Sequence, residues 1–204
     1  MQTSSLLRRI RIATWIIVAI GLTAGGLYFL TQRGPEIQKA IGGAARIGGP
    51  FQLVSHTGQP FTERDLAGKP YAIFFGFTHC PDICPTTLLD MSNRLEELKV
   101  DGDKLRMVFV SVDPERDTPQ YLAEYLKSFD KRIIGLTGTQ AQMAAIAKAY
   151  RVIYEKVPGT GGDYTMNHTA TVYLFDANGQ FASTLAYQES EQNQRAKLKR
   201  LIGG

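Results

Sequence analysis

The chain has 204 residues, of which 44% are hydrophobic and 21% charged, and it contains two cysteines. This length allows one substantial domain, and the composition excludes a wholly disordered chain. Two cysteines exclude a disulfide-dense scaffold and a four-cysteine zinc module. The net charge of +4 does not indicate nucleic-acid binding, because residues 1–46 hold six of the 23 basic residues and one of the 19 acidic residues. The rest of the chain is nearly neutral.

An uncharged apolar run extends from Ile12 to Leu30, and three arginines among residues 1–11 precede it. A helix of this length spans about 28 Å, close to the hydrocarbon thickness of a bilayer. The run therefore predicts a single-pass transmembrane anchor over residues 12–30, with residues 1–11 in the cytoplasm. A cleaved signal peptide is the alternative, since Thr23–Gly26 are small. The simplest location is a bacterial inner membrane, with the following domain in the periplasm.

Residues 31–46 are rich in glycine and lack apolar periodicity, so we expect a flexible linker ahead of a folded domain over residues 47–204. In that domain, apolar patterns predict strands over residues 51–54, 71–77, 105–112, 133–136, 169–175 and 181–187. Helical spacing and capping residues predict helices over 85–99, after Thr118, over 139–150 and from about Glu189 onward. Residues 155–167 are glycine-rich and predict an irregular loop.

This alternation of strands and helices indicates a three-layer α/β domain. Asn178-Gly179 lies between the last two predicted strands and is typical of a tight hairpin turn. We therefore expect a thioredoxin-like α/β fold with an added antiparallel β-hairpin.

Cys80 and Cys84 lie where a buried predicted strand passes into a helix. The free N–H groups of a helix start favour a thiolate there. A spacing of four also lets the two sulfurs approach each other, so a disulfide and a shared metal ion are both feasible. A structural disulfide would close a very short loop and constrain little of the unfolded chain. The position thus favours a reactive dithiol or a metal site.

Three histidines could add a ligand to this pair. His168 ends the glycine-rich stretch just before a predicted strand, where a ligand from a distant segment or a purely structural histidine would both fit. His79 neighbours Cys80 and should point away from a shared ion, and His56 lies in a predicted turn, where we expect it to be solvated. Two thiolates and one imidazole form a soft donor set that suits copper and, by ligand type, also zinc.

Three segments resemble the motifs of the Sco (SenC/PrrC-like) family, in the right order. Residues 76–85 resemble the family signature, residues 111–119 its second motif, and residues 163–169 the segment with its third metal ligand. Asn167 stands where many family members have aspartate, so a negative charge beside His168 is missing.

The resemblance implies a membrane-tethered copper metallochaperone that binds Cu(I) or Cu(II) through Cys80, Cys84 and His168. It implies that the protein assembles the dinuclear copper centre of cytochrome c oxidase subunit II, with an upstream periplasmic copper donor as a second partner. No nucleic acid is expected as a partner.

Two other functions remain open from the residues. The Cys80/Cys84 dithiol could act without metal in an enzyme, as a thiol–disulfide reductase or thiol peroxidase, although its spacing exceeds the Cys-x-x-Cys of thioredoxins. A tethered interaction module with a structural disulfide is the third interpretation. Asp113, Arg116 and Asp117 either organise the loop ahead of Thr118, with Arg116 in a local surface ion pair, or line the metal site.

Overall fold

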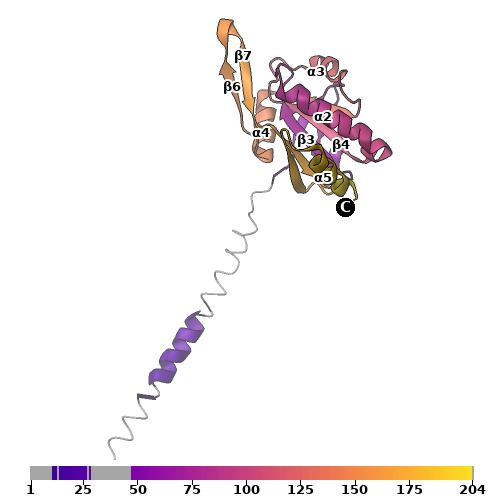
Figure 1. Ribbon diagram of the computed structural model, residues 1–204. Helices are drawn as coiled ribbons and strands as arrows, with labels where there is room; N and C mark the ends of the chain where they lie inside the picture. Colours follow the sequence, from indigo (N-terminus) through magenta and orange to yellow (C-terminus); the bar gives the residue numbers. More distant parts are fainter. Residues whose placement is uncertain (1–10, 13, 27, 29–46, 204) are drawn as a thin grey trace, which may run out of the picture. The chain divides into compact units, whose positions relative to one another are not determined.

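The computed structural model describes residues 11–12, 14–26, 28 and 47–203. Contacts divide the chain into two units, Met1–Ala45 and Arg46–Gly204 (Figure 1). In the first unit, residues 11–12, 14–26 and 28 are helical. Within the described residues, no helix has both the length and the apolar character needed to cross a membrane. The anchor over residues 12–30 is only partly described and stays a prediction, and residues 1–10 and the expected linker over 31–46 lie outside the described residues.

A seven-stranded sheet in the order β2-β1-β5-β4-β3-β8-β9 forms the centre of the second unit. Parallel pairing joins its three central strands, β3 (Tyr71–Gly76), β4 (Arg106–Ser111) and β5 (Ile133–Thr137). Antiparallel pairing adds the flanking strands β1 (Gln52–Ser55), β2 (Pro60–Thr62), β8 (Thr171–Phe175) and β9 (Phe181–Ala186). Every residue of β3 is buried, as expected for a strand covered on both faces.

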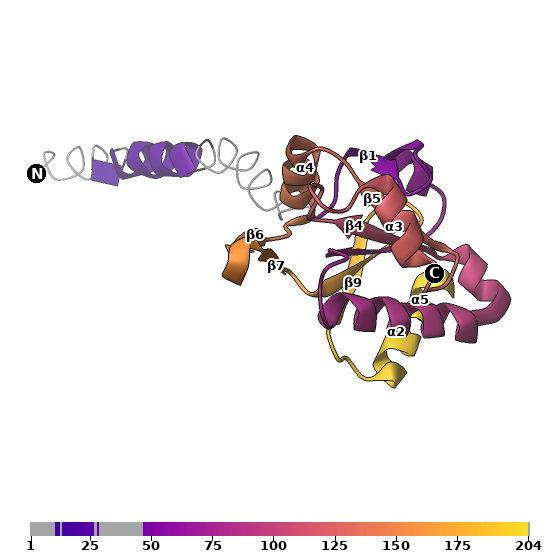
Figure 2. The ribbon, with the colours of Figure 1, turned by 90° about the horizontal axis from the view of Figure 1, so that it is seen from above.

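Four α-helices accompany this sheet: α2 (Ile83–Leu98), α3 (Pro119–Leu126), α4 (Gln140–Tyr150) and α5 (Glu191–Gly203). Helices α2 and α5 lie together on one face and α4 lies on the opposite face, which confirms the predicted α/β layering (Figure 2). The sequence signals for two helix starts are confirmed, since Thr118 accepts a hydrogen bond from the Tyr121 N–H and Thr139 forms a capping box with Gln142. Short 3-10 helices cover Glu63–Leu66, Lys99–Lys104 and Thr160–Gly162.

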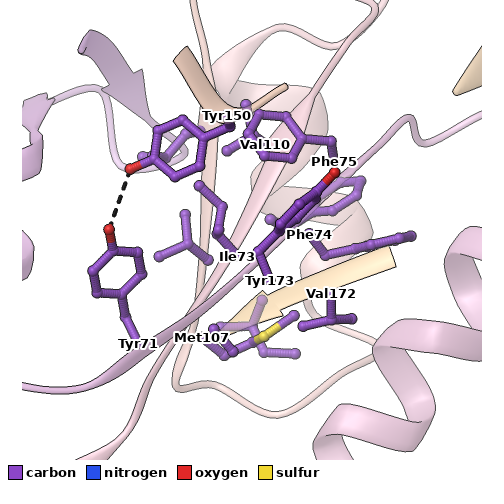
Figure 3. Packing of buried hydrophobic residues seen from close by; sticks show 14 of the residues in the cluster. Tyr71, Ile73, Phe74, Phe75, Met107, Val110, Tyr150, Val172 and Tyr173 are labelled. Atoms are coloured by element: carbon purple, nitrogen blue, oxygen red, sulfur yellow. Dashed lines mark hydrogen bonds between the residues drawn. The ribbon is translucent and has the colours of Figure 1, made fainter. Parts of the chain in front are cut away.

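Large aromatic side chains fill the core between the sheet and α4 (Figure 3). Phe75 and Tyr150 are fully buried with ring centroids 5.6 Å apart. The Tyr150 hydroxyl lies 3.3 Å from the Tyr71 hydroxyl, so each buried hydroxyl has a partner. This packing holds β3 rigidly, and β3 is the strand that leads to the cysteines.

Two predictions about these elements were wrong. Residues 155–167 are not an irregular loop, because β6 (Tyr154–Pro158) pairs with β7 (Tyr164–His168) as a two-stranded antiparallel sheet. The glycines are confined to the connection, where Gly161 and Gly162 have φ values of +72° and +87°. In addition, α2 begins at Ile83 rather than near Pro85, since proline is tolerated within the first helical turn. The earlier start places Cys84 inside that first turn.

A matched pair of leucines on α2 tests how far the core holds this helix in place. Leu88 is fully buried, whereas its neighbour Leu89 is 53% exposed. We expect Leu88→Ala to lower the free energy of unfolding by about 2–5 kcal/mol through lost burial and a new cavity. Leu89→Ala should change it by less than about 0.5 kcal/mol. Urea unfolding of both variants measures the difference, and equal effects would contradict the described orientation of α2.

Candidate metal centre

Three chain segments meet at one edge of the main sheet. Parallel pairing places Gly76, the last residue of β3, beside Ser111, the last residue of β4. Strand β8 runs antiparallel to β3 with Val172 opposite Phe74, so the residues just before β8 reach the same edge. The carboxyl ends of the parallel strands therefore bring the cysteine segment, the loop after β4 and the end of β7 together.

The two cysteines differ in exposure. Cys80 lies in the loop before α2 and is half-buried, whereas Cys84 lies in the first turn of α2 and is fully buried. Both cysteines are free thiols, and the Cys84 backbone N–H donates a hydrogen bond of 3.4 Å to the Cys80 sulfur. The start of α2 therefore stabilises negative charge on Cys80.

His168 reaches the cysteines from the end of β7. Its Nε2 lies 3.4 Å from the Cys84 Sγ, and its Nδ1 lies 3.2 Å from the Thr169 carbonyl oxygen. Because a carbonyl oxygen only accepts, Nδ1 carries the proton and donates, and the Nε2 lone pair faces the sulfur. The rings of Phe74 and Phe77 contact the imidazole edge-on, with centroids 6.0 and 5.8 Å away.

The donor atoms of Cys80, Cys84 and His168 all lie within 4.8 Å of one another. The structure thus brings together the three residues that the sequence singled out. Histidines that donate one ring N–H to a backbone carbonyl and present the other nitrogen are typical of metal ligands.

Proton affinity is divided unequally between the sulfurs. The hydrogen bond from Cys84 lowers the pKa of Cys80 to about 3 against the opposing effect of partial burial. The same interaction with Cys80, together with burial, raises the pKa of Cys84 far above its usual range. Cys80 is therefore the thiolate and Cys84 the thiol at neutral pH.

Gly76 makes room for the buried sulfur. A Cβ atom at this position would lie 2.7 Å from the Cys84 Sγ and 2.8 Å from Cε2 of Phe109. Real Cβ atoms do not approach sulfur or ring carbon so closely, so a side chain here would displace Cys84 or the strand. The segment that resembles the family signature begins at this glycine, but the sequence analysis gave the glycine no role. A glycine inside an apolar strand often indicates that another group packs closely against the backbone.

Asp117 holds the loop ahead of Cys80 in place through hydrogen bonds to Thr78. Its buried carboxylate accepts hydrogen bonds from the backbone N–H of Thr78 at 3.0 Å and from the hydroxyls of Thr78 and Ser111 at 2.5 Å. Desolvation raises its pKa, an effect that these hydrogen bonds oppose. Asp117 thus joins Ser111, at the end of β4, to the segment that leads to Cys80, so its role extends beyond the loop ahead of Thr118.

The other histidines lie outside the triad. His79 is exposed, stacks on Tyr121 with ring centroids 5.3 Å apart and turns Nδ1 toward the Thr78 hydroxyl at 3.0 Å, in keeping with the expected orientation away from the cysteines. The prediction that His56 is solvated was wrong, because it is half-buried and its Nδ1 accepts a 3.1 Å hydrogen bond from the Gly135 N–H.

Asn167 does not face the metal site, and Arg116 makes contacts beyond its own loop. Asn167 precedes His168 in an extended strand and is exposed, so its side chain lies on the opposite face of β7 from the imidazole. Arg116 is not limited to a local surface ion pair. It is only 18% exposed and binds both Asp113 and the β6–β7 hairpin.

The fold and the triad define a class: a thioredoxin-like α/β domain with a half-buried thiolate, a fully buried thiol and an imidazole at one sheet edge. The sequence family agrees with this class. The SCO1/SenC family model matches residues 39–203, and the chain belongs to that family.

Known proteins of this family resemble the chain over most of its length. The mitochondrial protein SCO2 of Saccharomyces cerevisiae is 38% identical over 197 residues, covering 91% of this chain and 65% of that relative. The chain thus spans slightly less than two thirds of that relative's length.

Two copper-bound solved structures share the fold. The copper-bound structure of ScoI from Bradyrhizobium japonicum is 48% identical with a TM-score of 0.72, covering 76% of this chain and 99% of that chain. Yeast Sco1 with copper bound is 38% identical with a TM-score of 0.72, covering 78% and 90% of the two chains. These likenesses confirm the predicted thioredoxin-like fold. The added hairpin that the sequence predicted around Asn178-Gly179 is the pair of strands β8 and β9.

The pKa difference between the cysteines predicts a flat pH dependence for alkylation of Cys80. Iodoacetamide attacks the thiolate, and a pKa of about 3 keeps Cys80 ionised at every higher pH. Its labelling rate should therefore be nearly the same at pH 5 and pH 8 and fall only toward pH 3, while Cys84 stays unlabelled. Peptide mapping by mass spectrometry separates the two sites. A rate that rises about tenfold per pH unit up to pH 8 would contradict the assignment.

Proposed function

We propose that this protein is a copper metallochaperone that assembles the dinuclear copper centre of cytochrome c oxidase subunit II. The observation that carries the proposal is the convergence of Cys80, Cys84 and His168, whose donor atoms lie within 4.8 Å of one another. Two sulfurs favour Cu(I), and the imidazole also makes Cu(II) acceptable. Copper is the cargo of such a protein.

The spacing of the donors fits one ion. At typical bond lengths of about 2.0–2.3 Å, three donors around an ion lie about 3.5–4 Å apart. The Cys84 Sγ and His168 Nε2 are already 3.4 Å apart. Small side-chain movements would therefore close the site, and the Thr169 carbonyl holds the imidazole with Nε2 free to bind.

The unequal exposure of the ligands suits transfer better than storage. Three ligands leave a coordination position open, and Cys80 borders solvent while Cys84 is buried. A ligand of the recipient protein can enter the open position beside Cys80 and displace that thiolate first. Cys84 and His168 retain the ion until further recipient ligands bind, so copper need not pass through solution.

Family membership and the copper-bound relatives support this function. In the proposed arrangement, residues 12–30 anchor the protein in a bacterial inner membrane and residues 31–46 form the linker. The domain over residues 47–204 then works in the periplasm, where a copper donor loads it and subunit II of the oxidase receives the ion.

The pKa difference between the sulfurs favours a second candidate function, thiol–disulfide exchange. The Cys80 thiolate would attack a target disulfide, forming a mixed disulfide and releasing one target thiolate. Cys84 would then lose its proton to water and attack the Cys80 sulfur, releasing the second target thiolate. The target would gain two electrons and the Cys80/Cys84 pair would end as a disulfide. This reaction does not need His168.

Copper titration with two histidine variants tests the main proposal. The reduced, metal-free full chain in mild detergent should bind one copper ion. His168→Ala should weaken binding by at least about 100-fold, because the loss of a ligand exceeds the 10–100-fold cost of losing its outer supports. His79→Ala is the matched control beside Cys80 and should change the affinity by less than about threefold.

Competition with a chelator of known affinity gives the copper dissociation constants of the wild type, His168→Ala and His79→Ala. Equal affinity in the wild type and His168→Ala would contradict the three-ligand site. If His168→Ala bound copper weakly but still reduced a target disulfide at the wild-type rate, the exchange reaction would be an independent activity of the same cysteines.

A further inference from the structure

The β6–β7 hairpin carries His168 but is not part of the main sheet. It forms a two-stranded sheet of its own and projects beyond the domain (Figure 1). Hydrogen bonds at its base join Thr169 to Ile153 in both directions, at 3.0 and 3.1 Å. These bonds hold the two strands to each other and do not reach the cysteines. The distance from His168 to Cys84 therefore depends on what else holds the hairpin.

Tyr164 lies at the other end of β7 on the same face as His168. Residues two apart in a strand share a face, and Met166 between them is buried. Thr165 and Asn167 are exposed on the opposite face. The side of β7 that carries Tyr164 and His168 is thus the side turned toward the domain.

Arg116 and Asp113, in the loop after β4, bind Tyr164 through hydrogen bonds and a cation–π contact. The guanidinium carbon of Arg116 lies 3.7 Å from the Tyr164 ring centroid, and its Nη1 donates to the Tyr164 carbonyl oxygen at 3.0 Å. Its Nε donates to Oδ2 of Asp113 at 2.5 Å, while the Tyr164 hydroxyl donates to Oδ1 of the same carboxylate at 2.8 Å. Each of the three residues therefore contacts the other two.

Two further sets of contacts join the loop after β4 to the hairpin and to the ring next to His168. Lys156 of β6 lies 3.8 Å from the Tyr164 ring centroid and pairs with Glu115 of the same loop at 2.6 Å. On the other side, the Arg116 guanidinium lies 5.9 Å from the ring centroid of Phe77, and Phe77 contacts the His168 ring. The loop after β4 is therefore connected to His168 through both the hairpin backbone and an aromatic ring.

We propose that Asp113, Arg116 and Tyr164, here called the clasp, hold the β6–β7 hairpin where His168 can bind the ion held by Cys80 and Cys84. They are positioning residues for the third ligand and do not touch the ion. This inference rests on the proposed function and adds to it. The clasp sets how tightly copper is held, because its opening would withdraw the imidazole and leave a two-sulfur site.

The first experiment tests the clasp without metal. Amide hydrogen exchange of residues 164–168 is compared in the full chain and in Arg116→Met, which keeps side-chain length but removes the charge and every hydrogen bond. We expect exchange at least about fivefold faster in the variant. Arg132→Met is the matched control, since Arg132 pairs with Asp130 and Asp103 and touches no clasp residue. It should leave exchange in the hairpin unchanged.

A double-mutant cycle then shows whether Arg116 acts through His168. In the wild-type background, Arg116→Met should weaken Cu(I) binding about tenfold and shift the thiolate-to-Cu(II) absorption toward that of His168→Ala. In the His168→Ala background, the same substitution should change the affinity by less than twofold. Tyr164→Phe keeps the ring and removes one hydrogen bond to Asp113, so we expect about a threefold loss from it.

The outcomes separate this inference from the proposed function. Equal losses from Arg116→Met in both backgrounds, or unchanged exchange in the hairpin, would overturn the clasp. If the wild type binds no copper, the proposed function fails, and the exchange measurement alone then decides whether the clasp holds the hairpin. Should Arg116→Met fold poorly, Tyr164→Phe provides the same cycle with a smaller change.

Discussion

The arrangement of the site depends on one steric constraint, the contact between the Cys84 sulfur and the backbone of β3 at Gly76. That strand is buried on both faces, so the helix that follows it must start against the core. Gly76 leaves just enough space for one sulfur, and a Cβ there would lie 2.7 Å from it. Cys84 is thereby buried while Cys80, in the loop before the helix, stays at the surface. The unequal proton affinities and the transfer mechanism both follow from this division.

The third donor, His168, is held in place by a different kind of interaction from the one that holds the cysteines. The cysteines are held by the packed core, whereas His168 is carried by a small hairpin with its own two-stranded sheet. Packing energy therefore fixes the sulfurs, while a few polar and aromatic contacts fix the imidazole. A site with two rigid ligands and one more weakly held ligand can bind an ion firmly and still release it to a partner.

Local sequence rules predicted the buried central strands, the capped helices and the position of the dithiol at the junction of β3 and α2. They failed for the β6–β7 hairpin, because three glycines in its connection hid the alternation of Tyr164, Met166 and His168. The start of α2 was misplaced because Pro85 was taken as the first helical residue. Contacts of Arg116 with the hairpin could not be predicted, since sequence does not show which distant segments a loop will meet.

X-ray absorption spectroscopy of the copper-loaded full chain tests the central claim most directly. The number and type of atoms bonded to copper would be measured in the wild type and in His168→Ala. We predict two sulfur ligands and one nitrogen ligand in the wild type, with the nitrogen lost in the variant and both sulfurs kept. Fewer than two sulfurs, or a nitrogen ligand that persists without His168, would contradict a site built from Cys80, Cys84 and His168.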